Sequence, residues 1–167
     1  IMADSCCYCC GGGDFFAASA RACELLCRRG IFLTRYPEQL PALPPMVRHF
    51  HYAPFSQILP HAAAFVHHGG IGSVAQGLRA GVPQLVMPCS YDQLDNATRV
   101  QRLGAGLPLP RPRYQPVAVA ASLRRLIEEI YARHTNKTQE EVHEDMERDR
   151  FFGADEAVEY GLVDRIV

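Results

Sequence analysis

The chain has 167 residues, of which 48% are hydrophobic and 21% are charged, and its formal net charge is −1. This composition is that of a globular protein with a core of its own, and the near-neutral charge gives no pull toward nucleic acid or a membrane surface. No apolar run approaches the roughly 18–20 residues that span a bilayer, and no signal peptide is visible at the start. We therefore expect a cytoplasmic protein.

Charge, proline and cysteine content all change near residue 127. Residues 1–127 hold 12 Arg and 6 acidic residues, whereas residues 128–167 hold 5 basic and 12 acidic residues. All 12 Pro and all 7 Cys lie in the first part. A joint shift of this kind predicts a boundary between two unrelated sequences. We divide the chain into a start at 1–13, a main domain at 14–127 and a tail at 128–167.

The start is crowded with cysteine and glycine. Cys6, Cys7, Cys9 and Cys10 precede three consecutive glycines. Their spacing is not the C-x2-C of a zinc site, and no matching His or Cys pair follows. A soft-metal site is the alternative, but we expect no metal and no cofactor, and we interpret residues 1–13 as an aberrant terminus.

The main domain opens with a helix and two strands. Asp14 can cap a helix that runs to Arg29, with Gly30 at its end. Short strands are predicted over 31–34 and 47–52, separated by a proline-rich loop. A helical turn over 56–59 should stop at Pro60.

The rest of the main domain alternates strands with helices. Strands are predicted over 62–67 and 85–87, helices over 73–80, 92–103 and 117–134, and a proline-rich loop or crossing segment over 107–116. Ser73 and Gln76 have the spacing of a capping box, which would fix the start of the first of these helices. This alternation predicts an α/β fold, a Rossmann-like parallel sheet with helices on both faces.

A glycine-rich turn over 65–73 stands where such sheets bind their ligands. Ligands of open parallel sheets lie beyond the carboxyl ends of the strands. The glycines let the backbone approach a ligand, and the helix start near Ser73 offers N–H groups and a positive dipole end to a diphosphate. His68 can add a further donor. From these residues alone, phosphate binding and a purely geometric need for glycine stay equally open.

The segment from Phe65 to Asn96, FVHHGGIGSVAQGLRAGVPQLVMPCSYDQLDN, resembles the donor-binding signature of GT-B glycosyltransferases of the UDP-glycosyltransferase type. TRYPEQLP, from Thr34, and HYAPFSQILPH, from His51, also resemble that family. The likeness covers residues 14–125 and implies half of a GT-B fold, the domain that binds a UDP- or TDP-sugar. The family's catalytic base lies in the other, acceptor-binding domain, so the resemblance implies a hexosyltransferase-type fragment that cannot complete transfer alone.

The resemblance also implies roles for single residues. His68, Gly70, Gly72 and Ser73 would bind the donor diphosphate, Gln76, Asp92 and Gln93 the ribose and sugar, and Tyr52, Phe55 and Ser56 would lie near the nucleobase. Two residues depart from the family: Val74 stands where Thr is common, and Gln76 where Glu is common. Structural roles without a ligand stay open for three residues. His67 could pack locally, Asp92 could merely cap its helix, and Tyr52 could belong to the core.

The tail contains the runs HTN from His134, ERDRFF from Glu147 and ADEAVEYGLVD from Ala154. Over these runs it resembles the C-terminal end of ClpP, the proteolytic subunit of the Clp protease. The pattern predicts a short α/β segment, with helices near 138–148 and 154–160 and strands near 150–152 and 162–167.

By this second resemblance, Asp149 is the Asp of a Ser-His-Asp triad whose other members are missing, so we expect no catalytic residue in the chain. Rival interpretations are an inactive ClpP-like peptidase fragment, which could self-associate through its tail, and an inert structural chimera. Whether such a fusion would be natural or artificial stays open.

Overall fold

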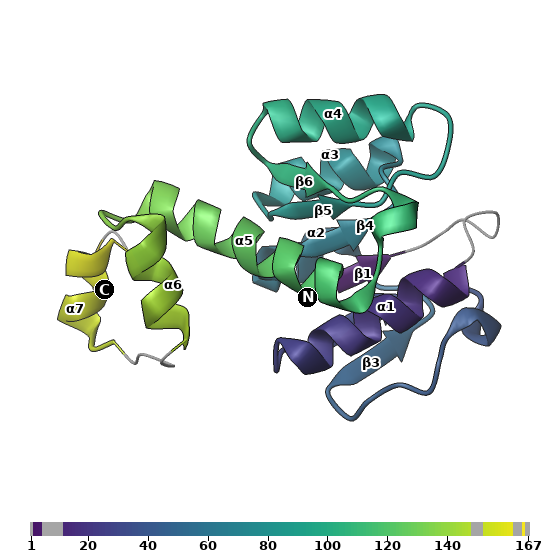
Figure 1. Cartoon of the computed structure of the whole chain (residues 1–167), viewed down its shortest axis with the longest axis horizontal. Coiled ribbons are helices and arrows are strands. Elements are labelled where there is room, and N and C mark those ends of the chain that lie inside the picture. The colour runs from purple at the N-terminus through teal and green to yellow at the C-terminus, as the bar shows by residue number, and fades with distance from the viewer. Residues whose placement is uncertain (1, 5–11, 148–151, 162–164, 166–167) are drawn as a thin grey trace. The chain divides into compact units, whose positions relative to one another are not determined.

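The structure, a computed structural model of the chain, describes residues 2–4, 12–147, 152–161 and 165 (Figure 1). The chain divides into two compact units, Ile1–Arg124 and Arg125–Val167. In the described part, no helix is both long and apolar enough to cross a membrane.

The first unit is built on one parallel sheet. Its six strands lie in the order β3-β2-β1-β4-β5-β6. Their bounds are Met2–Asp4 (β1), Gly30–Leu33 (β2), Val47–Phe50 (β3), Phe65–His67 (β4), Gln84–Val86 (β5) and Gly106–Pro108 (β6). The strand order reverses between β1 and β4, which creates a topological switch point at that place. The predicted α/β fold with a parallel sheet is confirmed.

The strand β1 was not predicted, and it lies within the cysteine- and glycine-rich start at 1–13. Met2–Asp4 lies in the middle of the sheet and pairs in parallel with both β2 and β4, Met2 standing opposite Ile31 and Phe65. Three residues beside a cysteine- and glycine-rich run do not stand out as a strand by periodicity. The cysteine cluster at 6–10 lies outside the described residues.

The edge strand β6 occupies the first two residues of the stretch 107–116, where a loop or a crossing segment was predicted. Gly106–Pro108 pairs in parallel with Gln84–Val86. A Cβ at Gly106 would overlap the carbonyl oxygen of Gln84, so glycine allows the two backbones to approach. Pro108 is tolerated because β6 is the last strand, where a missing N–H on the outer side costs no ladder bond.

Helices cover both faces of the sheet, with α1 in front of the strands and α3 behind them in Figure 1. The helices of the first unit are α1 (Gly12–Leu25), α2 (Phe55–Ile58), α3 (Ile71–Ala80), α4 (Gln93–Arg102) and the start of α5 (Pro116–His134), with 3-10 turns at Pro37–Gln39, Leu59–His61 and Arg111–Arg113. The second unit contains α6 (Gln139–Glu147) and α7 (Ala154–Tyr160). Val74 of α3 and Val100 of α4 pack with Val86 of β5 in one buried cluster. This cluster packs α3 and α4 against β5.

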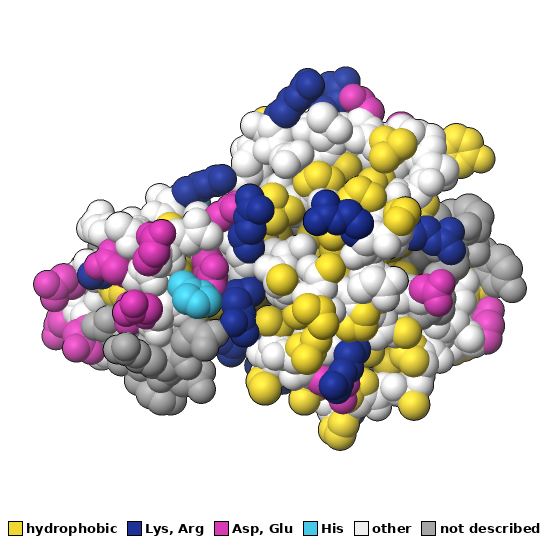
Figure 2. All heavy atoms as spheres, in the orientation of Figure 1, with side chains coloured by type: hydrophobic (Ala, Val, Ile, Leu, Met, Phe, Trp, Pro, Cys, Tyr) yellow, Lys and Arg dark blue, Asp and Glu magenta, His cyan; other side chains and the backbone are white. Residues whose placement is uncertain are grey.

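The second unit contains the end of α5, with α6 and α7, and acidic side chains gather on its surface (Figure 2). The helices predicted near 138–148 and 154–160 are confirmed, and Gly161, at φ +87°, ends α7. Glu141 of α6 accepts from the Thr138 N–H at 2.8 Å, which closes its first turn. Phe152 is not in a strand, and most of the two predicted tail strands, with Asp149, lies outside the described residues.

Candidate functional site

The turn between β4 and α3 exposes backbone at the carboxyl edge of the sheet. The helix begins at Ile71 with Gly70 as its N-cap and without a side-chain cap, so the predicted capping box of Ser73 and Gln76 is wrong. The first intrahelical bond runs from Val74 N to Gly70 O at 3.0 Å, so the preceding N–H groups have no acceptor within the helix. Apart from the adjacent residues and the backbone of α3 itself, no atom lies within 4 Å of the place of a Cβ on Gly72. An anion could therefore come close to this backbone.

His67 is part of the scaffold beneath the turn. Its ring is fully buried, and the Gly69 N–H donates to Nδ1 at 3.0 Å. Nδ1 is thus an acceptor, and Nε2 donates to Oε1 of Gln84 at 2.9 Å. Burial lowers the pKa of His67 to about 4, so the ring is neutral at physiological pH. This geometry fits the local, non-ligand reading of His67.

His68 follows with its ring against the start of α3. Its side chain is only 6% exposed, and a Cβ on Gly70 would lie 2.7 Å from Nε2. Burial lowers the pKa of His68, and the negative charge of Asp92 acts in the opposite sense. A neutral imidazole thus lies against the start of α3, near enough to Asp92 for that carboxylate to affect its pKa.

The start of α4 holds the next group of predicted residues. Asp92 is the N-cap residue but makes no side-chain cap, and its Oδ2 accepts instead from Nδ2 of Asn96 at 2.8 Å. Oε1 of Gln93 accepts from the N–H groups of Cys89 and Ser90, at 2.9 and 3.2 Å. One atom of Gln93 is therefore committed to ordering its own loop.

A cavity of about 730 Å³ lies beside α3, within the first unit. It is lined by Leu33, Thr34, Arg35, Tyr36, His51, Tyr52, Ala53, Pro54, Phe55, Ser56, Gln76 and Arg79. Tyr52 is 74% exposed, which excludes a core role, while the Phe55 ring packs on buried Phe65 at 5.3 Å between centroids. The structure therefore brings Gln76 together with all three residues expected near a nucleobase.

Some cavity residues had no role in the sequence interpretation. Arg79 lies three residues after Gln76 on α3, a spacing that places both on one helix face and could have signalled it. Arg35, which follows the end of β2, carried no comparable signal.

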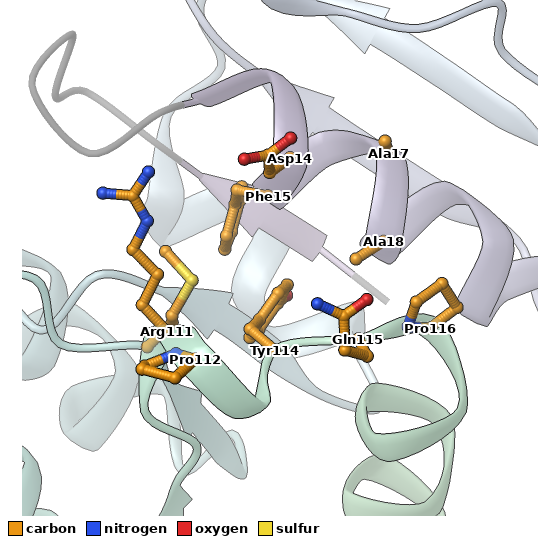
Figure 3. A pocket seen from close by; sticks show the side chains of 10 residues that line it. Asp14, Phe15, Ala17, Ala18, Arg111, Pro112, Tyr114, Gln115 and Pro116 are labelled. Carbon is orange, nitrogen blue, oxygen red and sulfur yellow. The ribbon is translucent and has the colours of Figure 1, made fainter.

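A second cavity, of about 470 Å³, contains none of the predicted residues (Figure 3). Asp14 and Arg111 are its charged lining residues. Its wall is fixed by the stacking of Phe15 on Tyr114, whose hydroxyl lies 2.8 Å from Oγ of Ser19. This cavity is therefore separate from the group formed by residues 52–56 and Gln76.

Comparison with known proteins gives the family context. A family model described as "Erythromycin biosynthesis protein CIII-like, C-terminal domain" matches residues 31–149. O-mycaminosyltylonolide 6-deoxyallosyltransferase of Streptomyces fradiae is 38% identical over 115 residues, which cover 68% of this chain and 26% of that protein. Aklavinone 7-beta-L-rhodosaminyltransferase of Streptomyces galilaeus is 41% identical over 87 residues, or 52% of this chain and 20% of that protein. The chain thus spans a minor part of the length of these relatives.

Solved structures agree with the fold. The calicheamicin glycosyltransferase CalG4 matches with a TM-score of 0.65 and 26% identity, covering 89% of this chain and 37% of that chain. The glycosyltransferase VinC, solved in complex with DTDP, matches with a TM-score of 0.63 and 26% identity over 89% of this chain and 36% of that chain. The fold is that of half a GT-B glycosyltransferase. Because the family model spans well over half of the sequence, the chain belongs to the erythromycin biosynthesis protein CIII-like C-terminal domain family.

Proposed function

We propose that this chain binds the nucleotide-sugar donor of a glycosyltransferase, with a UDP- or TDP-sugar as ligand. The observation that carries the proposal is the shared cavity of residues 52–56 and Gln76 beside the open start of α3. Its volume, about 730 Å³, is in the range of small-molecule sites.

The nucleoside would occupy this cavity. Tyr52 offers an exposed aromatic face for a base, and Phe55 is anchored by its contact with Phe65. The amide of Gln76 can donate to or accept from a ribose hydroxyl. Arg79 adds a positive charge to the same wall, which favours an anionic ligand.

The diphosphate would lie at the start of α3. Ile71, Gly72 and Ser73 present N–H groups there, at the positive end of the helix dipole, and Gly72 leaves the approach open. His68, beside Gly70, can donate a further hydrogen bond. The sugar would then reach the start of α4, where Asp92 and the uncommitted amide nitrogen of Gln93 can bind hydroxyls.

Calorimetric titration tests this proposal. UDP, TDP, a UDP-sugar and a TDP-sugar are added separately to the full chain. We expect saturable, one-to-one binding of at least one nucleotide and its sugar, with competition between the two. Absence of heat and of any thermal shift for all four ligands, with the protein folded, would overturn the proposal.

A substitution at His68 should weaken diphosphate binding. A hydrogen bond to a charged group contributes about 1.5–3 kcal/mol, so we expect His68→Ala to lower nucleotide affinity by about ten-fold or more. The matched control is His61→Ala, which changes an exposed histidine on the Leu59–His61 turn. Equal affinities of both variants and the unchanged chain would contradict the role of His68.

We further propose that this chain alone does not complete glycosyl transfer. The support is its extent, since it corresponds to 26% of the length of the Streptomyces fradiae relative. Incubation with a UDP- or TDP-sugar and a phenol or macrolide should give no glycoside, although slow release of free sugar to water is compatible with the proposal. Stoichiometric formation of the glycoside would refute it.

The tail, in our proposal, is a ClpP-like segment without catalytic activity. The family model reaches residue 149, so the support comes from the run ADEAVEYGLVD that begins at Ala154, beyond that match. An orienting Asp has no function without its His and Ser partners. Fluorogenic peptides should therefore remain uncleaved, and Asp149→Asn should change neither peptide cleavage nor nucleotide affinity; peptide hydrolysis abolished by that change would contradict this.

A further inference from the structure

Asn96 occupies an unusual position in the first turn of α4. Its side chain is 7% exposed although the helix carries many polar residues on its outer face. Its Nδ2 group donates to the carbonyl oxygen of Gly69 at 2.9 Å and to Oδ2 of Asp92 at 2.8 Å. One buried amide therefore contacts both the β4–α3 turn and the carboxylate at the start of α4.

Gly69 is held by two hydrogen bonds, one at its N–H group and one at its carbonyl oxygen. Its N–H donates to Nδ1 of His67, and its carbonyl accepts from Asn96. Gly69 has φ +92°, a conformation that reverses the chain just before the N–H groups at the start of α3. These two bonds therefore fix the direction in which the turn presents its backbone.

Asparagine suits this position because of the number of hydrogen-bond donors on its side chain. A primary amide carries two N–H donors, and here each faces one acceptor, a carbonyl and a carboxylate. An ionised Asp at 96 would have the same size but no donor, and it would stand beside another carboxylate. An apolar residue would leave both acceptors without this partner, which is costly in a buried place.

We infer that Asn96 is a positioning residue that couples the β4–α3 turn to the carboxylate of Asp92, so that the diphosphate and the sugar are held in a fixed relation. This inference rests on the proposed function. Asn96 does not contact the ligand; it acts by holding Gly69 and Asp92.

The test compares affinities for UDP and for a UDP-sugar, or for the TDP pair if that is the one bound. Asp92→Ala should act mainly on the nucleotide sugar. The isosteric Asn96→Asp should lower both affinities, by about ten-fold or more for the nucleotide alone. The reason is that the carbonyl oxygen of Gly69 loses its hydrogen-bond donor, so the turn is no longer fixed. Thr98→Ala is the matched control, since it removes one exposed hydrogen bond to Leu94 O on the same helix and should change neither affinity.

A double variant separates coupling from simple loss of stability. In the Asn96→Asp background, Asp92→Ala should cost less nucleotide-sugar affinity than it does alone, because Asp92 has already lost its partner. Additive losses would overturn the coupling. Unchanged dissociation constants in both Asn96→Asp and Asn96→Ala, with only a lower melting temperature, would show a purely structural role.

The amide hydrogen exchange of the turn makes the inference independent of the ligand. If the unchanged chain binds no nucleotide, the proposed function fails, but Asn96→Ala should still speed exchange at Gly69 and the following residues more than at the end of α4. Equal exchange at both places would overturn the positioning role itself.

Discussion

Gly69→Ala should be among the most damaging single substitutions in the described part of the chain. We expect it to lower the free energy of unfolding by about 2–4 kcal/mol and to abolish measurable nucleotide binding. At φ +92°, a residue with a Cβ is strained, and that Cβ would lie 2.8 Å from Cγ1 of Val86 and 3.2 Å from the carbonyl oxygen of Gln93. Neither β5 nor the backbone of α4 can move without disturbing the sheet.

Gly81→Ala is the control for this experiment. Gly81 also has a positive φ, +66°, but apart from its adjacent residues no atom lies within 4 Å of its Cβ position. It should therefore show only the backbone cost, about 1 kcal/mol, and keep its nucleotide affinity. Urea unfolding of both variants gives the comparison, and equal losses would show that the packing around Gly69 is not tight.

Acid should destabilise the first unit through His67. The pKa of His67 is lowered to about 4 in the folded chain, whereas an unfolded chain takes up this proton near pH 6.5. The unfolded state thus binds more protons between these values, and stability is lost as pH falls from about 6.5 to 4. The shift corresponds to about 3 kcal/mol at the lower end of that window. The lowered pKa of His68 acts in the same direction.

Denaturant unfolding at several pH values tests this expectation. His67→Gln removes the titrating ring and should flatten the dependence between pH 6.5 and 4, even if stability at pH 7 is lower. His61→Gln, at an exposed position, should leave the dependence as it is. A His67→Gln variant with an unchanged acid slope would contradict the assignment of that slope to His67.

Patterns long enough to show a period were sufficient to predict most of the fold. The strand at Gly30–Leu33 and the helix at Pro116–His134 lie within a residue or so of their expected bounds. The strand β1 was missed because residues 2–4 precede a cysteine- and glycine-rich run that suggested no regular structure, and β6 was missed because prolines near Pro108 suggested a loop. An edge position removes that objection, but edge position is a property of the whole sheet and cannot be read locally.

Part of the candidate site could likewise be predicted from the sequence, and part of it could not. The motif supplied the residues of the turn and of the start of α4, and the structure adds how they are held: His67 by Gln84, and Asp92 by Asn96. These supporting contacts join residues 17 and 4 positions apart. The start of α3 was misplaced by two residues because Ser73 and Gln76 imitate a capping box, whereas Gly70 provides the N-cap without a side chain.

The most direct test of the account is an amide-resolved NMR titration of the full chain with TDP or UDP and the corresponding nucleotide sugar. Binding of the nucleotide should shift the amides of Ile71, Gly72 and Ser73 together with those of residues 52–56, and the sugar should add shifts near Asp92 and Gln93. Shifts confined to the cavity of Asp14 and Arg111, or no shifts at ligand concentrations in the millimolar range, would contradict the claim that this chain is a donor-binding domain.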